Sequence, residues 1–165
     1  MTDDRRQRCG ILLREHRAIL FKVAAVYAHD AEDRHDLAQE IALQVWRSFA
    51  SYDASRPFST WMYRVALNVG LSHARRRSER TQPLDDALAD TLGGGTPIDE
   101  PDERVAWLMR AIGALPPLDR ALVMLHLDEL SYAEIASVLG IAESNVGTRL
   151  NRIKQRWRHT WNSTN

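Results

Sequence analysis

The last third of the chain contains the feature that most constrains the fold, a pattern of two closely linked helices over residues 131–146. Ser131 and Glu134 have the spacing of a capping box, in which the hydroxyl and the carboxylate each accept a hydrogen bond from a backbone N–H. Gly140 stands where the first helix must stop, a position that favours a residue able to adopt positive φ. The apolar residues are spaced to share one core: Ile135, Leu139, Ile141, Val146 and Leu150. The pattern therefore predicts a helix-turn-helix.

The second helix of this pattern continues into a basic segment that ends near Arg158. A helix that enters a DNA major groove amino end first presents its early residues to base edges and its later cations to phosphates. We predict base contacts from Ser144, Asn145, Thr148 and Arg149, and phosphate contacts from Arg152, Lys154 and Arg156. Gly147 lies inside this helix and costs roughly 1 kcal/mol of helix propensity. A solvated basic helix face is the structural alternative.

Composition limits the class of protein. The chain has 165 residues and 44% apolar content, enough for packed cores. No apolar run approaches the roughly 20 residues of a membrane span, and the charged start leads to no apolar segment of the secretory type. The single cysteine, Cys9, excludes an internal disulfide. These features predict a cytoplasmic protein.

The net charge of zero conceals an uneven distribution along the chain. Residues 81–103 carry a net charge of −7 with no Lys or Arg, whereas the segments before and after them carry +4 and +3. The same acidic stretch is rich in Gly and Pro, which marks a flexible connection. We predict an all-α protein with two small helical domains, over residues 9–79 and 104–161, joined by a flexible acidic linker over residues 80–103.

Periodicity predicts the helices of both domains. In the first domain we expect a helix over 11–28, a polar corner over 30–36, a helix over 36–49, a loop over 51–57 and a helix from Ser59 or Thr60 to Arg77. On that last helix an apolar stripe should be formed by Trp61, Val65 and Val69 with Met62 and Ala66, and a polar stripe by Arg64, Asn68, Ser72 and Arg75. In the second domain, helices over 103–114 and 118–127 should precede the helix-turn-helix.

The order of motifs in both domains resembles a known family. The first domain contains Asp36-Leu37-Ala38-Gln39-Glu40, Val45-Trp46, Tyr52-Asp53, the run from Arg56-Pro57-Phe58 to Leu67-Asn68, and Arg75-Arg76-Arg77. This series resembles region 2 of bacterial RNA polymerase sigma factors. Leu115-Pro116-Pro117 and residues 131–158 resemble region 4. The chain lacks room for a full region 3, an arrangement similar to the extracytoplasmic-function (ECF) group. The resemblance covers nearly the whole chain.

The resemblance implies partners and roles for individual residues. Asp36, Gln39 and Glu40 would bind the β′ clamp helices of core RNA polymerase, and region 4 would meet the β flap. Minus-ten promoter DNA would be bound, and a base held out of its stack, by residues of the loop and the following helix: Arg56, Phe58, Trp61, Tyr63, Arg64, Asn68, Ser72, Arg75, Arg76 and Arg77. Phe58 and Trp61 could instead belong to the core. Region 4 would bind the minus-thirty-five element, and an anti-sigma factor is expected.

Two other classes of function remain open on sequence alone. A helix-turn-helix regulator could bind duplex DNA without polymerase, although such a protein has no use for the motifs of the first domain. His29-Asp30, His35-Asp36 and His73 could indicate a metal-dependent phosphohydrolase, but a polar corner with Asp caps explains the same residues. We expect no enzymatic activity, no metal and no cofactor.

Overall fold

The structure is a computed structural model that describes residues 2–80 and 102–164. Within these ranges most residues lie in α-helices and none in a β-strand, which confirms the all-α fold class. The chain divides into two compact units, residues 1–94 and 95–165. Most of the predicted linker, residues 81–101, lies outside the described residues.

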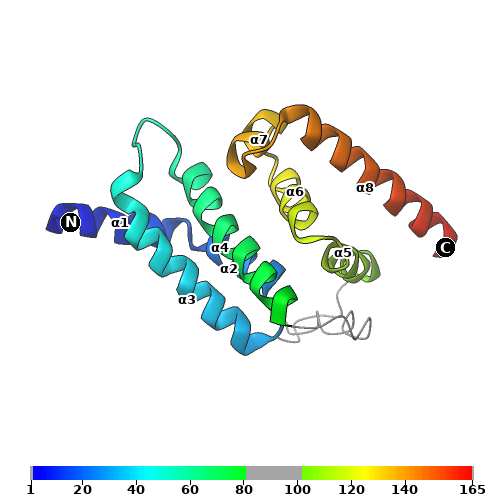
Figure 1. Cartoon of the computed structure of the whole chain (residues 1–165), viewed down its shortest axis with the longest axis horizontal. Coiled ribbons are helices and arrows are strands. Elements are labelled where there is room, and N and C mark those ends of the chain that lie inside the picture. The colour runs from blue at the N-terminus through cyan, green and yellow to red at the C-terminus, as the bar shows by residue number, and fades with distance from the viewer. Residues whose placement is uncertain (1, 81–101, 165) are drawn as a thin grey trace. The chain divides into compact units, whose positions relative to one another are not determined.

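Within residues 2–80, the first unit contains four α-helices and one short 3-10 helix (Figure 1). These are α1 (Asp3–Glu15), α2 (Arg17–Tyr27), α3 (Ala31–Ser48), η1 (Phe49–Ser51) and α4 (Phe58–Arg80). Helices α2, α3 and α4 pack against one another in all three pairings. Their shared core is apolar and includes Val23, Leu37, Ile41, Val45, Met62 and Leu67.

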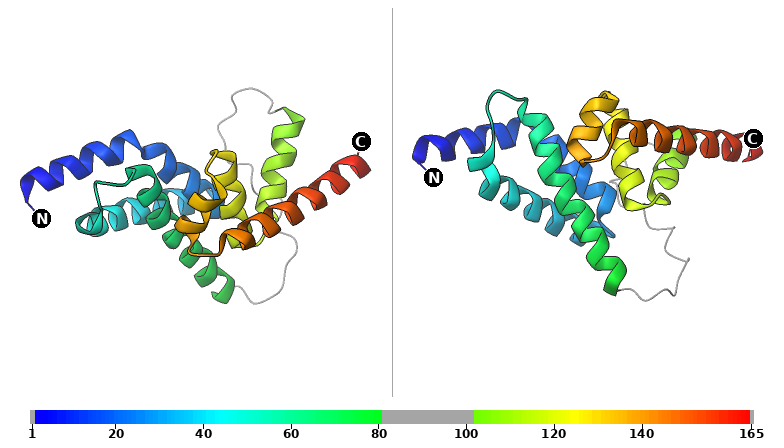
Figure 2. Two further views of the ribbon diagram at one scale, coloured as in Figure 1. Left: turned by 90° about the horizontal axis from the view of Figure 1, so that it is seen from above. Right: turned by 45° about the horizontal axis from the view of Figure 1, so that its top comes forward.

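The helices of this unit differ from the sequence prediction at several boundaries. The helix predicted over 11–28 is two helices, because the backbone leaves helical geometry at His16; the change of direction can be followed in the blue ribbon of Figure 2. The His16 ring packs on Phe58, with 5.2 Å between ring centroids. The predicted polar corner over 30–36 is wrong beyond Asp30, whose side chain caps α3 by accepting from the Asp33 N–H at 2.8 Å. Helix α4 begins at Phe58, before the predicted caps, and runs to Arg80.

The buried face of α4 also differs from the prediction. Trp61, Val65 and Val69 are only partly buried, whereas the fully covered positions are Phe58, Met62, Tyr63, Ala66, Leu67 and Gly70. Gly70 permits a close approach of α4 to α2, since a Cβ there would lie 2.6 Å from Tyr27 Cδ2. Met62 and Ala66 of the predicted stripe are therefore confirmed as core residues, while Trp61, Val65 and Val69 lie at its edge and the core extends instead to Tyr63, Leu67 and Gly70.

The second unit contains α5 (Glu103–Gly113), α6 (Pro117–Leu127), α7 (Tyr132–Leu139) and α8 (Glu143–Thr164). The predicted helix-turn-helix is confirmed. The Ser131 N–H donates to Glu134 Oε2 at 2.7 Å and the Glu134 N–H donates to Ser131 Oγ at 3.1 Å. Gly140 ends α7 with φ of +69°. Buried apolar residues join α6, α7 and α8, among them Leu122, Leu125, Ile135, Val146 and Leu150.

Tryptophan side chains hold the far end of α8 against α5. Trp107 of α5 lies between Trp157 and Trp161, with ring centroids at 5.9 and 5.2 Å and near-perpendicular planes. Such edge-to-face pairs are worth about 0.5–1.5 kcal/mol each beyond the area that they bury. Trp157 and Trp161 are therefore half-buried against α5, while residues 158–160 between them are exposed.

Candidate nucleic-acid and polymerase interfaces

Helix α8 separates a buried apolar face from an exposed polar one. Val146, Leu150 and Ile153 are buried. The residues predicted to contact DNA occupy the other positions: Ser144, Asn145, Thr148, Arg152 and Arg156 are exposed, while Arg149 and Lys154 are half-buried. The packing thus leaves a row of hydroxyl, amide and guanidinium groups on the outer face of the helix.

Arg149 forms contacts inside the protein. Its Nη1 donates to Asp119 Oδ1 of α6 at 2.8 Å, and its Nε donates to Asn145 Oδ1 at 3.3 Å. The Asp119 side chain is only 17% exposed. Sequence reasoning did not identify Asp119, because it precedes Arg149 by 30 residues and no local spacing joins them. Part of the hydrogen-bonding capacity of the Arg149 guanidinium, which is predicted to contact a base, is therefore used by the contact with Asp119 of α6.

Gly147 is accommodated by the packing between α7 and α8. A Cβ at this position would lie 3.5 Å from Cε2 of Tyr132, an ordinary van der Waals distance. Neighbouring Thr148 donates its hydroxyl to the Ser144 carbonyl at 2.9 Å and keeps lone pairs that can accept. Gly147 therefore lies on the side of α8 that faces α7, and the exposed side of this turn carries Ser144 and Thr148.

Helix α4 presents the predicted basic and polar stripe in the first unit. Arg64, Asn68 and Arg75 are exposed, and Ser72 is half-buried. Arg76 pairs with Glu40 of α3, with 3.1 Å between Nη2 and Oε1.

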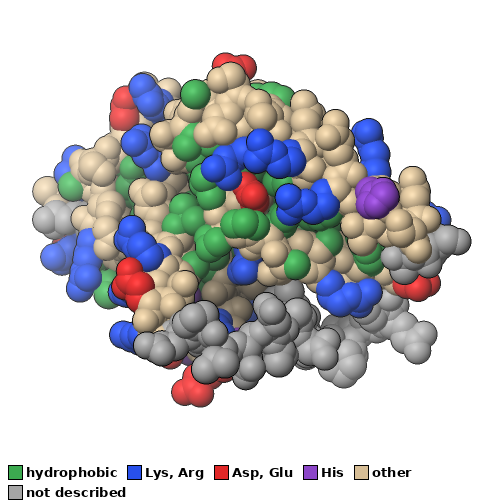
Figure 3. All heavy atoms as spheres, turned by 45° about the vertical axis from the view of Figure 1, so that its right-hand side comes forward, with side chains coloured by type: hydrophobic (Ala, Val, Ile, Leu, Met, Phe, Trp, Pro, Cys, Tyr) green, Lys and Arg blue, Asp and Glu red, His purple; other side chains and the backbone are tan. Residues whose placement is uncertain are grey.

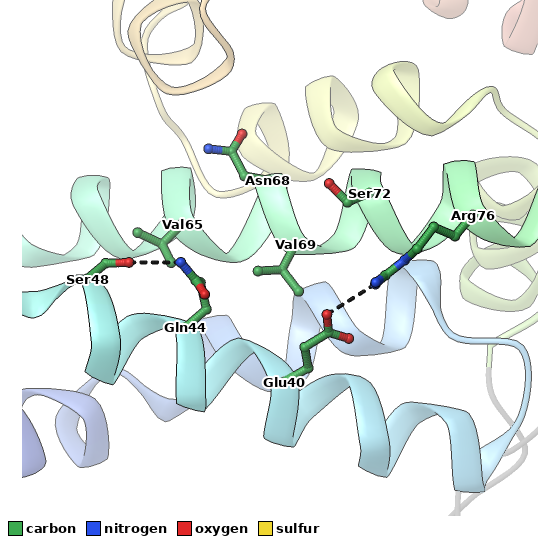
Figure 4. Close-up of a pocket in the computed structure, with 8 residues that line it drawn as sticks. All are labelled: Glu40, Gln44, Ser48, Val65, Asn68, Val69, Ser72 and Arg76. Atoms are coloured by element: carbon green, nitrogen blue, oxygen red, sulfur yellow. Dashed lines mark hydrogen bonds and ion pairs between the residues drawn. The ribbon is translucent and has the colours of Figure 1, made fainter.

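Helices α3 and α4 border an open hollow of about 320 Å³, lined by Glu40, Gln44, Ser48, Val65, Asn68, Val69, Ser72 and Arg76 (Figure 4). In the view of Figure 3, Lys and Arg side chains lie at the surface beside apolar ones.

The loop before α4 is shaped by its own hydrogen bonds. The Tyr52 hydroxyl donates to the Arg56 carbonyl at 2.8 Å, and Asp53 Oδ1 accepts from the Ser55 N–H at 2.9 Å. That backbone hydrogen bond is the main cause of a lowered Asp53 pKa. The arrangement leaves the Arg56 side chain exposed.

An aromatic cluster lies beneath this loop. Phe49, Tyr52, Phe58 and Trp61 form it, with ring centroids 5.3–6.3 Å apart in the contacting pairs. Phe58 and Tyr63 are 5% and 4% exposed, so both belong to the core. Trp61 and Tyr52 are half-buried at its edge. Among the residues of this segment predicted to bind minus-ten DNA, Arg56 is therefore exposed and Trp61 is partly exposed, whereas Phe58 and Tyr63 are buried.

Helix α3 carries the residues predicted to bind polymerase. Asp36, Gln39 and Glu40 are exposed. Leu43 and Trp46 follow them at helical spacing and are 47% and 37% exposed. Sequence reasoning did not assign a role to Leu43, although an exposed apolar residue beside carboxylates on one helix face is a usable signal for a protein partner.

The His and Asp residues considered as metal ligands are dispersed. His73 Nε2 lies 3.1 Å from Asp33 Oδ2, which also accepts from the His29 N–H at 2.8 Å. His35 instead contacts Gln39 on its own helix. Within residues 2–80 and 102–164, no group of three or more His, Cys, Asp or Glu side chains could hold a metal ion. The His73–Asp33 pair joins α4 to α3.

Two family models match this chain. Sigma-70 region 2 matches residues 12–80, and Sigma-70, region 4 matches residues 106–156. The ECF RNA polymerase sigma factor SigE of Mycolicibacterium smegmatis is 33% identical over 153 residues, covering 89% of this chain and 59% of that protein. SigW of Bacillus subtilis is 33% identical over 137 residues, covering 75% of this chain and 71% of that protein.

Solved structures share the fold. CnrH in complex with the cytosolic domain of CnrY has a TM-score of 0.67 at 22% identity, covering 96% of this chain and 91% of that one. The sigma factor RpoE in complex with the anti-sigma factor NepR from Bartonella quintana has a TM-score of 0.66 at 18% identity, covering 96% of both chains.

The chain belongs to the sigma-70 family and, within it, to the ECF group of sigma factors, which bind core RNA polymerase and direct it to promoters. These findings support that function over the two alternatives, a regulator acting on duplex DNA alone and a metal-dependent phosphohydrolase. None of the described helices is long and apolar enough to cross a bilayer.

Proposed function

We propose that the sigma function is divided between the two predicted domains, residues 9–79 and 104–161, which the predicted linker over residues 80–103 joins. The first binds core polymerase and opened minus-ten DNA, and the second binds the minus-thirty-five duplex. The observation that carries this proposal is α8, where exposed Ser144, Asn145 and Arg152 alternate with buried Val146 and Leu150 on a capped helix-turn-helix.

The polymerase-binding surface lies on α3. Asp36, Gln39 and Glu40 offer acceptors and charge, and Leu43 and Trp46 add apolar area on the same side. Protein interfaces combine an apolar centre with a polar rim, and tryptophan is enriched at their centres. This surface fits the β′ clamp helices, and the second domain takes the β flap.

The minus-ten surface combines α4 with the loop before it. Arg64, Asn68 and Arg75 are exposed along α4, while Arg56 and Trp61 stand at the rim of the aromatic cluster. Stacking on an aromatic returns about 1–3 kcal/mol per base, against the few kcal/mol that base extrusion costs. We assign Phe58 and Tyr63 to the support of this rim. Ser72, Arg76 and Arg77 complete the DNA-facing side.

Along α8, the proposed DNA contacts change from base edges at the amino end to phosphates on later turns. Ser144, Asn145 and Thr148 lie at the amino end and meet base edges. Arg152, Lys154 and Arg156 lie on later turns and meet phosphates. Arg149 contributes through its contacts with Asp119 and Asn145.

Three further assignments follow from the family. The chain acts as a non-catalytic subunit of the polymerase, which makes the bonds. It works in the cytoplasm, where core polymerase and promoter DNA are found in bacteria. It is held inactive by an anti-sigma factor, a partner supported by the solved RpoE complex with NepR.

The experiment is run-off transcription with core polymerase and fragments of the organism's genomic DNA. We expect discrete transcripts that need both the chain and core. Upstream of each start, two conserved elements should lie at a constant spacing. Binding to duplex fragments without any core-dependent transcript would favour the regulator instead.

A further inference from the structure

A chain of three side chains links α6 to the outer face of α8. Asp119, in the first turn of α6, accepts from Arg149 Nη1 at 2.8 Å, and Arg149 Nε donates to Asn145 Oδ1 at 3.3 Å. The Asp119 and Arg149 side chains are 17% and 35% exposed, so their charge-assisted contact is partly shielded from water. Asn145, at the outer end of this relay, is exposed.

The relay determines which end of the Asn145 amide faces outward. A guanidinium only donates, so the amide atom that meets Arg149 Nε must be the oxygen. This contact takes one of the two lone pairs of the oxygen and turns the oxygen toward the guanidinium. The Nδ2 amino group is then the end of the amide turned away from Arg149, so Asn145 is biased toward donation at a base.

This orientation disfavours the usual asparagine contact to DNA, because a cation already donates to the amide oxygen. Bidentate binding of adenine needs the amide oxygen to accept from N6 while the amide nitrogen donates to N7. Guanine offers the acceptors O6 and N7 in the major groove, and thymine offers O4. An amide that turns its amino group outward, beside a guanidinium that also only donates, therefore suits guanine or thymine better than adenine or cytosine.

We propose that Asp119 is a positioning residue for upstream promoter recognition: through Arg149 it holds Asn145 as a hydrogen-bond donor and selects guanine or thymine at the base facing Asn145. The inference rests on the proposed placement of α8 in the minus-thirty-five major groove. Asp119 is suited to this role because its helix start is itself fixed, with Arg120 Nε donating to the Leu115 carbonyl at 2.8 Å.

The test measures base preference, which loss of stability alone would not change. The full chain is assembled with core polymerase, and competition binding is measured on promoter fragments that carry each base pair at every upstream position. Asn145→Ala identifies the position that Asn145 reads. There the wild-type holoenzyme should prefer guanine or thymine over adenine by about five- to 150-fold, the range of one specific base contact.

Two variants then break the relay in different ways. Asp119→Asn removes the charge that anchors Arg149. Arg149→Lys keeps the positive charge, but a single ammonium lacks the planar fork that reaches both partners. Both should reduce the preference against adenine at that one position at least fivefold and leave the salt dependence of binding unchanged. Arg152→Ala is the matched control, and should weaken all sequences alike and lower the salt slope by about one.

The outcomes separate the inference from the function on which it rests. If both relay variants fold, as judged by circular dichroism, and keep the wild-type base profile, the inference is wrong and the proposed function stands. A wild-type preference for adenine at the Asn145 position would also overturn it. A wild-type holoenzyme with no upstream base preference would overturn the proposed function and the inference together.

Discussion

Arg76 of α4 donates to Glu40 of α3 with 3.1 Å between Nη2 and Oε1, and this ion pair joins the proposed DNA surface to the proposed polymerase surface. The two side chains are 52% and 46% exposed. Exposed pairs of this kind are worth about 0–1 kcal/mol, because water screens them and both side chains lose freedom. Substitutions at either residue therefore report on binding more than on folding.

We expect Asp36→Lys combined with Glu40→Lys to weaken binding to core polymerase at least tenfold, because like charges replace the carboxylates at the interface. The thermal midpoint should change by only a few degrees. Arg76→Gln is the control, since it breaks the same ion pair and keeps both carboxylates. Pull-down of core with each purified variant measures the effect. Equal core affinity in the double variant and the wild type would remove α3 from the interface.

Promoter opening should depend on the rim of the aromatic cluster. Arg56→Ala and Trp61→Ala should slow opening, as measured by permanganate reactivity of promoter thymines, and a template with a pre-melted bubble should restore much of the activity. Phe58→Ala should act through stability instead, because emptying a buried phenylalanine site costs about 3–5 kcal/mol. Opening at the wild-type rate in both rim variants would show that these side chains are structural.

Gly70→Ala should destabilise the first unit by about 1–3 kcal/mol, the usual cost of overpacking. The added Cβ would lie 2.6 Å from Tyr27 Cδ2 and 3.2 Å from Val23 Cγ1. Gly10→Ala is the matched control, because it also lies within a helix and its Cβ would meet nothing within 4 Å. It should be neutral or stabilising. Urea unfolding of the two variants distinguishes them, and equal midpoints would mean that α2 and α4 can move apart at little cost.

The second unit offers a comparable pair of glycines. Gly147→Ala should stabilise it by about 0.5–1 kcal/mol, because alanine is the better helix former and the new Cβ would rest 3.5 Å from Tyr132. Gly140→Ala should destabilise it by about 1–2 kcal/mol, since φ is +69° there. Thermal unfolding followed by circular dichroism measures both. A destabilising Gly147→Ala would contradict the packing described at Tyr132.

Asp33 should make the stability of the first unit decrease at low pH. Burial raises the pKa of its carboxyl, but hydrogen bonds from the His29 N–H and His73, with the nearby charges of His73 and Arg77, outweigh burial and lower the pKa. The native state then binds this proton less readily than the unfolded state, whose pKa is roughly 3.9. Its stabilisation is present above that value and is lost as the pH falls through the lower native pKa.

Asp33→Asn should therefore lower stability at about pH 5 and flatten the loss of stability on going to about pH 3. Urea unfolding at each pH measures this dependence. Glu32→Gln, an exposed neighbour in the first turn of α3, is the control. A pH dependence that Asp33→Asn leaves unchanged would show that other carboxylates cause it.

The helix-turn-helix could be predicted from sequence because its signals are local. The capping box spans Ser131 to Glu134, and Gly140 stops α7 by a backbone conformation that few other residues adopt. The buried face of α4 was harder to assign. Apolar residues lie on more than one side of this helix, Tyr63 and Leu67 as well as Val65 and Val69, so that periodicity alone identifies Met62 and Ala66 correctly but misplaces one edge of the stripe.

The pairs that shape the candidate sites could not be predicted in the same way. Glu40 with Arg76, Asp33 with His73, and Asp119 with Arg149 are separated by 36, 40 and 30 residues. No spacing rule relates positions so far apart. Sequence reasoning selected both members of the first pair, for separate surfaces, and only His73 and Arg149 of the other two pairs. The packing of the helices is what brings the partners together.

The two faces of α8 have a consequence for how promoter preference can change over evolutionary time. Ser144, Thr148 and Arg152 are exposed and take no part in the buried core of the helix-turn-helix. Mutations at these positions can therefore alter the DNA sequence that is bound without disrupting the fold. Arg149 is different. Its loss would leave the mostly covered Asp119 carboxylate without this cation, so a lineage that changes residue 149 is expected to change residue 119 as well.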